Sequence, residues 1–412
     1  MASNAVVNDR LDRLADYPFA RLTTLLADLQ PATNRPPVVM SIGEPQHTPP
    51  DLIRDAIAKS PPDAWGKYPP MAGTPEWRAA ALGWLARRYP LGGRLVDPDK
   101  GILPLAGTRE GLYLAAQLCV PSQKAGRQPA VLLPNPFYAV YDGAGRLAGA
   151  EPVYLPATRE TGFLPDLDAI PEDTLARTAL MFLTSPANPQ GACADAAYLR
   201  KALALARTYG FTLAVDECYA DIYDAAPPVG ALDAAAGTGG GPAGGGDPLA
   251  NLLVFHSLSK RSSAAGLRSG FVAGDARLIQ AFARMRSYAH AGTPVAGFAA
   301  ATALWADDAH AEENRRLYRQ KIDAAEAALG GRFGCFYRPP GGFFLWLDVG
   351  DGEAACRRLW REGGLRVLPG AYVTRPDSQG VNHGSPYIRV ALVHDAAIVA
   401  EACARMAEIL DC

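Results

Sequence analysis

The residues with the most evident chemistry in this 412-residue chain lie in the segment SLSKRSSAAGLR, residues 257–268. The apolar run at 252–255 precedes it and predicts a buried strand. Lys260 is therefore expected at a strand end, where its amine can form an imine with a carbonyl compound. The nearby hydroxyls and Arg268 suit a phosphate, so the segment indicates pyridoxal phosphate as a cofactor. A solvated surface lysine is the alternative for this segment taken alone.

A second candidate group is Asp216, which follows the apolar run 211–215. A carboxylate at the end of a buried strand needs a partner that offsets its desolvation, and a protonated pyridine nitrogen is such a partner. Tyr219 lies three residues further on and can reach an oxygen of the same ring. A metal-binding pair formed by Asp216 and Glu217 is the alternative, although the sequence supplies no further ligands with metal-site spacing.

Two loops that follow predicted strands present further polar groups. Thr108 and Arg109 open a predicted helix, where unpaired backbone N–H groups attract an anion. Asn188 lies in SPANPQG, residues 185–191, whose prolines and glycine favour a rigid turn. Its amide is placed to donate a hydrogen bond to a phenolate oxygen. An ordinary helix cap and an ordinary structural turn are the respective alternatives.

One aromatic residue and one arginine complete the candidate set. Tyr138 follows the predicted strand at 130–133 and can lie flat on a planar cofactor, or else belong to the core. Arg389 interrupts the apolar run 387–392. A buried arginine requires a carboxylate, which either a substrate or a structural salt bridge can supply.

These groups need a scaffold that brings distant strand ends together. Helical and strand patterns alternate through most of the chain, which predicts an α/β fold with a mainly parallel sheet. The carboxyl ends of such strands meet at one edge, where ligands bind. The expected helices are 75–89, 107–118 and 197–209, and the expected strands are 130–133, 180–183, 211–215, 252–255 and 271–273, the last with an antiparallel option.

After about residue 300 the pattern changes to a smaller α+β unit. It comprises an expected helix at 309–329, strands at 342–349 and 387–392, and a helix at 396–410, with a helix near 20–29 packed beside it. The segment 234–247 is rich in glycine and is expected to form a flexible loop. It lacks the strand and helix context of a phosphate-binding loop.

Composition limits the possible partners. The formal net charge is −2, which gives no indication of nucleic acid or of an anionic membrane surface as a partner. The first twenty residues include five charged side chains and no apolar core of a signal peptide, and no stretch reaches the length of a membrane span. The seven cysteines form no CxxC pair. We therefore expect reduced thiols in a cytoplasmic protein and no metal site.

Taken together, the motifs resemble the fold-type I pyridoxal-phosphate aminotransferases of classes I and II. The matching segments are SIGEP (41–45), AGTREGL (106–112), NPFY (135–138), SPANPQG (185–191), DECY (216–219), SLSKRSSAAGLRSG (257–270) and YIRV (387–390). The resemblance implies a large domain at 46–298, with a mostly parallel seven-stranded sheet between helices. It also implies an N-terminal arm at 1–45 that belongs partly to the small domain, and a small α+β domain at 299–412.

The resemblance also implies a role for each matched residue. Lys260 forms the Schiff base with the cofactor and shuttles the proton, while Asp216 pairs with the pyridine nitrogen. The remaining cofactor contacts are assigned to Asn188 and Tyr219 at the phenolic oxygen, to Tyr138 as the stacking ring, and to Thr108, Arg109, Ser257, Ser259 and Arg268 at the phosphate. Because many relatives carry a smaller residue at 109, a backbone role is expected there.

Two further roles concern the partner subunit and the substrate. Tyr68 is expected to reach the phosphate of the neighbouring subunit, which implies a homodimer with active sites at the interface. Arg389 is expected to bind the α-carboxylate of the amino acid or 2-oxo acid, with Asn188 and the backbone near Gly43 alongside. Turnover is expected to follow ping-pong kinetics.

Within the family the chain is most similar to N-succinyldiaminopimelate aminotransferases, which act in lysine biosynthesis. The similar segments are YPFARL (17–22), SIGEPQHTPP (41–50), NPFYAVYDGAGRLAGAEPVYL (135–155), GFLPDLDAIPE (162–172) and HSLSKRS (256–262). The implied reaction moves an amino group between N-succinyl-LL-2,6-diaminopimelate and 2-oxoglutarate. The alternatives are an aspartate or broad-range aminotransferase and a β-lyase on the same scaffold. A regulator with an aminotransferase-like sensor domain is not expected, since SIGEP begins at residue 41.

Overall fold

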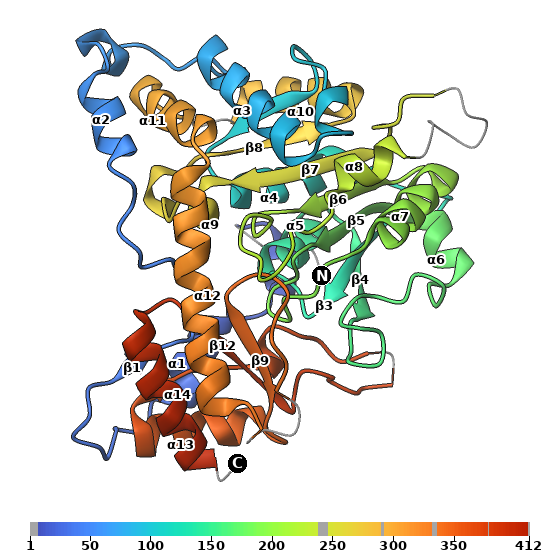
Figure 1. Cartoon of the computed structure of the whole chain (residues 1–412). Helices are drawn as coiled ribbons and strands as arrows, with labels where there is room; N and C mark the ends of the chain where they lie inside the picture. Colours follow the sequence, from blue (N-terminus) through green and yellow to red (C-terminus); the bar gives the residue numbers. More distant parts are fainter. Residues whose placement is uncertain (1–6, 238–245, 290–291, 332–335, 378, 411–412) are drawn as a thin grey trace.

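The computed structural model describes residues 7–237, 246–289, 292–331, 336–377 and 379–410 (Figure 1). Its centre is a seven-stranded sheet in the order β2-β8-β7-β6-β5-β3-β4. The strands in that order are β2 (Ile102–Leu105), β8 (Gly270–Gly274), β7 (Leu252–Ser257), β6 (Thr212–Asp216), β5 (Thr178–Thr184), β3 (Ala130–Asn135) and β4 (Glu151–Pro156). In this sheet β8 runs in the direction opposite to the other six strands. The predicted α/β fold with a mainly parallel sheet is confirmed.

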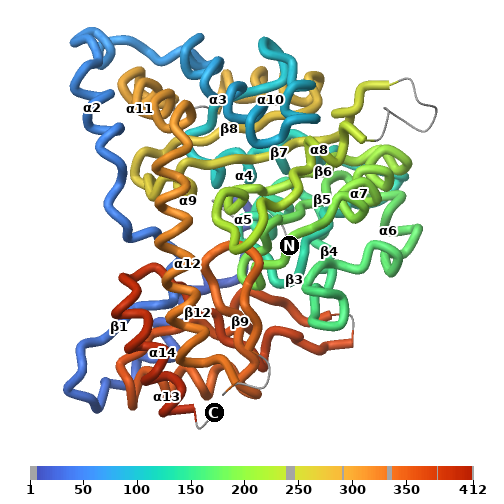
Figure 2. Tube along the Cα trace, in the orientation of Figure 1, coloured from blue at the N-terminus to red at the C-terminus, as the bar shows by residue number. Residues whose placement is uncertain are grey.

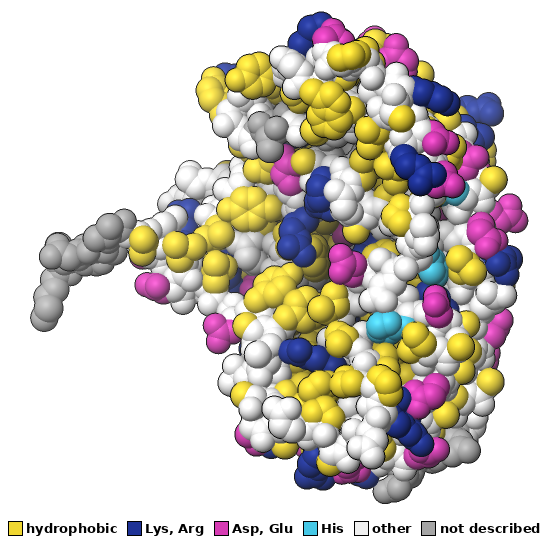
Figure 3. All heavy atoms as spheres, turned by 90° about the vertical axis from the view of Figure 1, so that its left-hand side faces the viewer, with side chains coloured by type: hydrophobic (Ala, Val, Ile, Leu, Met, Phe, Trp, Pro, Cys, Tyr) yellow, Lys and Arg dark blue, Asp and Glu magenta, His cyan; other side chains and the backbone are white. Residues whose placement is uncertain are grey.

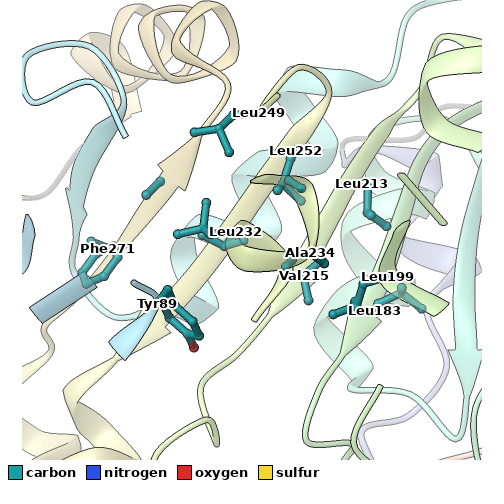
Figure 4. Close-up of a cluster of buried hydrophobic side chains, with 14 of the residues drawn as sticks. Tyr89, Leu183, Leu199, Leu213, Val215, Leu232, Ala234, Leu249, Leu252 and Phe271 are labelled. Atoms are coloured by element: carbon teal, nitrogen blue, oxygen red, sulfur yellow. The ribbon is translucent and has the colours of Figure 1, made fainter. Parts of the chain in front are cut away.

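Helices cover both faces of this sheet because its strands are apolar on both sides. In β7, Leu252 and Val254 belong to one buried cluster, whereas Leu253 and Phe255 belong to another. Alternating side chains of a strand point to opposite faces, so each face needs its own cover. The helices α3 (Pro75–Arg88), α7 (Ala196–Tyr209), α8 (Ala231–Ala236) and α11 (Val295–Ala306) supply the first cluster, part of which Figure 4 shows; α4 (Thr108–Cys119), α5 (Ala139–Leu147) and α10 (Ala276–Ala289) supply the second.

Local signals in the sequence explain several helix boundaries. Helix α3 begins after Thr74, whose hydroxyl accepts a hydrogen bond from the Trp77 amide at 3.2 Å. Helix α7 begins after Asp195, which caps the Tyr198 amide in the same way. It ends at Gly210, which takes the left-handed conformation with φ of +63° that a side chain would disfavour. The expected helix at 197–209 is confirmed to within one residue.

A smaller unit lies below the large sheet in Figure 1. Its three-stranded antiparallel sheet has the order β11 (Leu368–Pro369), β12 (Tyr387–Ala391) and β9 (Phe344–Asp348), and a two-stranded parallel sheet joins β1 (Val38–Val39) to β10 (Leu365–Arg366). Its helices are α1 (Pro18–Leu25), α12 (Ala309–Leu329), α13 (Gly352–Gly363) and α14 (Ala396–Leu410). Residues of α12, α13, α14 and both sheets share one buried apolar cluster. The helices expected at 309–329 and 396–410 are confirmed.

Two segments connect the units. The chain after β1 rises from the smaller unit to α2 (Leu52–Ala58), beside the large sheet, as the trace in Figure 2 shows. Helix α12 spans the two units. It contacts α9 (Leu258–Arg261), which directly follows β7 in the large unit, and it packs against α14 in the smaller unit. The domain boundaries at residues 45 and 298 stay a prediction.

The structure differs from two expectations. Helix α1 spans Pro18–Leu25 instead of 20–29, because proline is favoured at the first position of a helix. Ala234–Ala236, expected in a glycine-rich loop, belong to α8, whose alanines favour a helix and of which Ala231, Ala234 and Ala235 are buried. Residues 238–245 of that segment lie outside the described part. The remaining short helix of the large unit is α6 (Glu172–Arg177). No helix within the described ranges combines the length and apolarity needed to cross a membrane.

Candidate active site

One cavity of about 660 Å³ lies at the carboxyl ends of β5, β6 and β7, where the smaller unit approaches the large sheet. A cavity of this size holds a cofactor or a medium-sized ligand. It is lined by all but one of the predicted site residues: Gly43, Thr108, Arg109, Tyr138, Asn188, Asp216, Tyr219, Ser257, Ser259, Lys260, Arg268 and Arg389. Tyr68 is the exception and is fully exposed.

Lys260 reaches this cavity from α9, a single helical turn. Ser257 begins the turn, since its hydroxyl accepts a hydrogen bond from the Ser259 amide at 3.1 Å. The Lys260 amine donates a hydrogen bond to the Gly43 carbonyl. Burial lowers the pKa of Lys260 to about 8, because a charged amine loses hydration there. The surface-lysine alternative is wrong, and a neutral, nucleophilic amine is accessible near neutral pH.

Asp216 lies at the end of β6 with its carboxylate directed into the same cavity. One oxygen accepts a hydrogen bond from the Tyr141 hydroxyl at 2.7 Å, and the other accepts from the Cys218 amide at 3.1 Å. Burial raises the pKa of Asp216, while these hydrogen bonds oppose the rise. Among the described residues, no lysine or arginine lies within salt-bridge distance of it. A buried carboxylate without a lysine or arginine partner suits a positively charged ligand atom.

Glu217 does not join Asp216 in a metal site. Its two carboxylate oxygens accept hydrogen bonds from the Tyr89 hydroxyl and the Ala231 amide, both at 2.6 Å, on the other side of the strand. The described part of the chain contains no group of three or more potential metal ligands. The paired-carboxylate alternative is therefore wrong, and Glu217 anchors β6 to α3 and α8.

An anion cradle lies beside Lys260 at the start of α4. Gly107 has a φ of +84°, and a Cβ atom there would lie 2.2 Å from the Arg268 guanidinium. The absence of a side chain thus lets Arg268 approach the N-terminus of α4, where unpaired amides and the helix dipole attract an anion. Two arginine nitrogens donate to the Ala265 and Ala106 carbonyls at 2.9 and 3.3 Å, which holds the guanidinium in place. Thr108, Ser257 and Ser259 line the same region.

Arg109 differs from the expectation of a backbone role alone. Its side chain donates a hydrogen bond to the Tyr138 hydroxyl at 2.7 Å. The Tyr138 ring packs edge-on against Tyr141, with centroids 5.5 Å apart. Two contacts therefore fix the orientation of the ring that was predicted to stack on the cofactor. Sequence spacing does not reveal this contact, because Arg109 and Tyr138 lie on different elements.

Arg389 enters the cavity from β12 and is only 7% exposed. Its guanidinium donates to the Ser41 carbonyl at 2.7 Å and to the Asn188 side-chain oxygen at 3.3 Å. No carboxylate of the described residues pairs with it, and its Nε has no hydrogen-bond partner. The structural salt-bridge alternative is therefore wrong. Burial lowers the pKa of Arg389 to about 10, so it remains a cation at neutral pH and suits a ligand carboxylate.

The sequence profile of the family "Aminotransferase class I and II" matches residues 35–406. This chain belongs to the class I and II aminotransferases. It is 31% identical over 405 residues, 96% of each chain, to an LL-diaminopimelate aminotransferase of Desulforudis audaxviator. The structure resembles an aminotransferase from Neisseria meningitidis Z2491, with a TM-score of 0.91, 39% identity and 98% and 99% coverage of the two chains. It also resembles aminotransferase AspB from Helicobacter pylori 26695, with a TM-score of 0.85, 32% identity and 97% and 99% coverage.

Aminotransferases of this family depend on pyridoxal phosphate, and the cavity fits that cofactor. Lys260 offers an amine for its aldehyde, and the cradle beside Gly107 offers donors for its phosphate. Asp216 offers a buried carboxylate for the pyridine nitrogen. Burial raises the pKa of Tyr219, so its hydroxyl stays protonated and can donate to the phenolic oxygen. Asn188 directs its side-chain oxygen to Arg389 and lines the same cavity, so its amide nitrogen is the atom that can donate to the phenolic oxygen.

Tyr141 is a residue of the aminotransferase site that sequence analysis did not identify. It is fully buried, lines the cavity and lies flat against Phe182, with centroids 4.5 Å apart. Its hydroxyl also lies 3.0 Å from the Thr184 hydroxyl, so Asp216 is positioned through a chain of polar groups. The NPFYAVY segment contains the residue, but an apolar helix face gives an equally good account of it in sequence.

Proposed function

We propose that this aminotransferase moves the amino group of N-succinyl-LL-2,6-diaminopimelate to 2-oxoglutarate. The proposal depends on the identity of one segment that lines the cavity. Tyr17, Pro18 and Phe19 come from YPFARL, a segment in which the chain is similar to N-succinyldiaminopimelate aminotransferases and which is not among the motifs of the family as a whole. The similarity therefore includes positions that line the cavity, in addition to those that hold the cofactor.

The residues of the cavity support transamination of an α-amino acid in the following way. Arg389 binds the α-carboxylate and Asn188 lies beside it, which orients Cα toward Lys260. When bound, pyridoxal phosphate supplies an electron sink for the negative charge left at Cα. Lys260, with its pKa lowered to about 8, accepts the proton from Cα at its Nζ. Asp216 holds the positive charge of the cofactor ring, and Tyr219 donates to its oxygen.

A second donor, free LL-diaminopimelate, is favoured by one observation each from the comparisons and the cavity. The relative from Desulforudis audaxviator carries the name LL-diaminopimelate aminotransferase. Glu44 lines the cavity, and a carboxylate there would attract the distal ammonium that the free diamino acid carries and the succinyl derivative lacks. The two donors differ only at that distal group, so they can be compared directly.

The decisive experiment is a donor panel with purified holoenzyme and 2-oxoglutarate as acceptor. The panel compares kcat/KM for N-succinyl-LL-diaminopimelate, LL-diaminopimelate, acetylornithine, aspartate and aromatic amino acids. We expect the succinyl derivative to give the highest value. A higher value for LL-diaminopimelate would replace the first donor with the second, and a higher value for aspartate would overturn both. Release of pyruvate and ammonia without an acceptor would indicate a β-lyase.

We further propose that the enzyme works as a homodimer in which Tyr68 serves the partner's site. Tyr68 is fully exposed and Trp65 is 64% exposed, which is unusual for large aromatic side chains and typical of contact surfaces. Figure 3 shows apolar side chains exposed among charged ones on one face of the molecule.

Light scattering tests the dimer, and Tyr68→Phe tests the residue. We expect a mass of two chains and a cofactor dissociation constant raised about 10-fold, the value of one hydrogen bond to a charged group. Tyr288→Phe is the matched control, because Tyr288 is also 91% exposed but was not predicted to bind the cofactor. A monomer, or equal cofactor affinity in both variants, would contradict this proposal.

A further inference from the structure

The side-chain amide of Asn314 uses all of its hydrogen-bonding positions beside the short helix α9, Leu258–Arg261, which we call the Lys260 turn. It lies on α12 and is 7% exposed. Its nitrogen donates to the Lys260 carbonyl at 2.9 Å and to the Arg261 carbonyl at 3.1 Å. Its oxygen accepts from the Ser263 hydroxyl at 3.0 Å and lies 2.7 Å from Nδ1 of His47. No other side-chain type supplies two donors and two acceptor lone pairs in this geometry, except the longer glutamine.

The Lys260 turn needs such a partner because it is too short to stabilise itself. Helix α9 spans only Leu258–Arg261, and the last carbonyls of any helix lack intrahelical partners. Within α9 and its cap, the Leu258 carbonyl accepts from the Ser262 amide at 3.0 Å. The carbonyls of Lys260 and Arg261 are the last two of the helix, and Asn314 pairs both. The backbone of the reactive lysine is thus fixed from outside its own helix.

The side-chain amide of Asn314 also connects the Lys260 turn to the segment 43–47, part of which lines the cavity. Because the two N–H groups of Asn314 face carbonyls, its oxygen must accept, and His47 must carry its proton on Nδ1. His47 lies four residues after Gly43, whose carbonyl accepts a hydrogen bond from the Lys260 amine. Lys260 is therefore held at its backbone carbonyl by Asn314 and at its amine by the segment that Asn314 anchors through His47.

We propose that Asn314 is a positioning residue for the transamination, which sets where the Lys260 amine lies relative to the cofactor and to substrate Cα. The proposal rests on the aminotransferase reaction and does not depend on which donor the enzyme prefers. Proton transfer requires the amine within hydrogen-bond reach of its target, so a shift of the turn affects the catalytic step more than substrate binding. Arg389 lies on β12, and none of the hydrogen bonds of Asn314 reaches it directly, although both residues are linked to the main chain at 41–47, so we expect a smaller change in KM than in kcat.

The test compares Asn314→Ala and Asn314→Asp with Arg316→Ala as a matched control on the same helix. Arg316 is exposed, and its side chain pairs with Glu313 at 2.7 Å, away from the cavity. For both Asn314 variants we expect kcat to fall about 10-fold or more, with KM changed less than about 3-fold. Aspartate is included because it keeps the shape of the side chain but faces the two carbonyls with negative charge.

A spectroscopic reading separates positioning from simple stabilisation. The pH at which the visible absorbance of the holoenzyme changes would report protonation of the Lys260 nitrogen where it is joined to the cofactor, and so the position of that nitrogen. We expect this midpoint to move by about 0.5 pH units or more in the Asn314 variants and to stay in place in Arg316→Ala. A variant with a lower melting temperature but unchanged kcat and unchanged midpoint would overturn the proposal.

A second pair of variants keeps the test decisive if Asn314→Ala does not fold. His47→Ala and Ser263→Ala each remove one donor to the Asn314 oxygen and leave both carbonyl contacts intact. We expect each to move the absorbance midpoint in the same direction as Asn314→Asp, but by less. Movement in neither variant, together with unchanged kcat, would show that the amide does not transmit position to Lys260 and would overturn the proposal.

Discussion

The large sheet and the three-stranded sheet each place one buried cation in the same cavity, and the two cations differ in what burial does to them. Lys260 follows β7, and burial lowers its pKa to about 8. Arg389 lies in β12, and burial lowers its pKa to about 10. The first residue can lose its proton near neutral pH, and the second cannot. A similar loss of hydration thus produces a base in one region and a permanent anchor for carboxylates in the other.

The largest expected effect comes from removing the base. Lys260→Ala should lower kcat by about 10⁴-fold or more, because it removes both the amine and the proton acceptor. Lys260→Arg should lose as much activity, since a guanidinium at this position retains its proton. Steady-state transamination and the visible absorbance of the bound cofactor measure both losses. Near-normal turnover in either variant would break the distinction between the two cations.

Removing the charge of Asp216, the buried anion of the same cavity, should produce the next largest effect. Asp216→Asn keeps the shape of the side chain and its contact with Tyr141, but removes the charge that balances the cofactor ring. Leaving one member of a buried pair without its partner costs about 3–5 kcal/mol, so kcat should fall roughly 150- to 5,000-fold. Single-turnover kinetics monitored at the cofactor absorbance measure this change. An unchanged rate would exclude a cationic partner for Asp216.

Changing the anchor should affect binding more than chemistry. Arg389→Ala should raise KM for both the amino acid and the 2-oxo acid about 10–10²-fold, the value of hydrogen bonds between charged groups. Arg389→Lys should recover part of the loss, because it keeps the charge but not the two-pronged geometry. Steady-state kinetics with each substrate varied in turn measure the effect. A fall in kcat with constant KM would contradict the anchor role.

The smallest expected effect is on stability in the protein without cofactor. Between pH 8 and 10.5 the unfolded chain holds more protons at Lys260 than the folded protein does, so stability rises with pH across this window. Lys260→Met removes that penalty and should melt a few degrees higher at pH 7, since about 1 kcal/mol moves Tm by ~2 °C in a large chain. The advantage should shrink above pH 8. Thermal melts from pH 7 to pH 9.5 test this.

Arg389→Met supplies the contrast in the same melts. The pKa of Arg389 in the folded protein is about 10, so its contribution to stability begins to change with pH only near pH 10. The difference in Tm between Arg389→Met and the unsubstituted protein should therefore stay constant from pH 7 to pH 9.5. Parallel slopes for the two variants would remove the distinction between a titrating base and a fixed anchor.

The sequence was sufficient to predict the polar residues that lie directly at the end of a buried strand. Lys260 and Asp216 each follow an apolar run, and the end of such a run fixes where the next polar side chain emerges. The α/β fold with a mainly parallel sheet was also predictable, because strands and helices alternate with clear boundaries, whereas the type I fold was implied by the resemblance of the motifs.

The groups that position those residues were not predictable. Tyr141 is 75 residues from Asp216, and Asn314 is 54 residues from Lys260, on helices whose polar residues look ordinary in sequence. The sequence predicted a backbone role for Arg109, yet its side chain donates a hydrogen bond to the Tyr138 hydroxyl. Such contacts arise from how elements pack, which local patterns do not encode. Helix α8 was missed because the glycines that follow it dominate the composition of its segment.

Both cations donate to the same short stretch of main chain: Arg389 to the Ser41 carbonyl and Lys260 to the Gly43 carbonyl. Main-chain oxygens cannot be altered by substitution, so side-chain exchange at Ser41 or Ile42 leaves these two acceptors chemically intact. Gly43 is the exception, because a Cβ there would lie 2.4 Å from the Phe344 ring and displace the stretch. An engineer who reshapes this pocket therefore has freedom at Ile42, whereas a change at Gly43 would disturb the base and the anchor in one step.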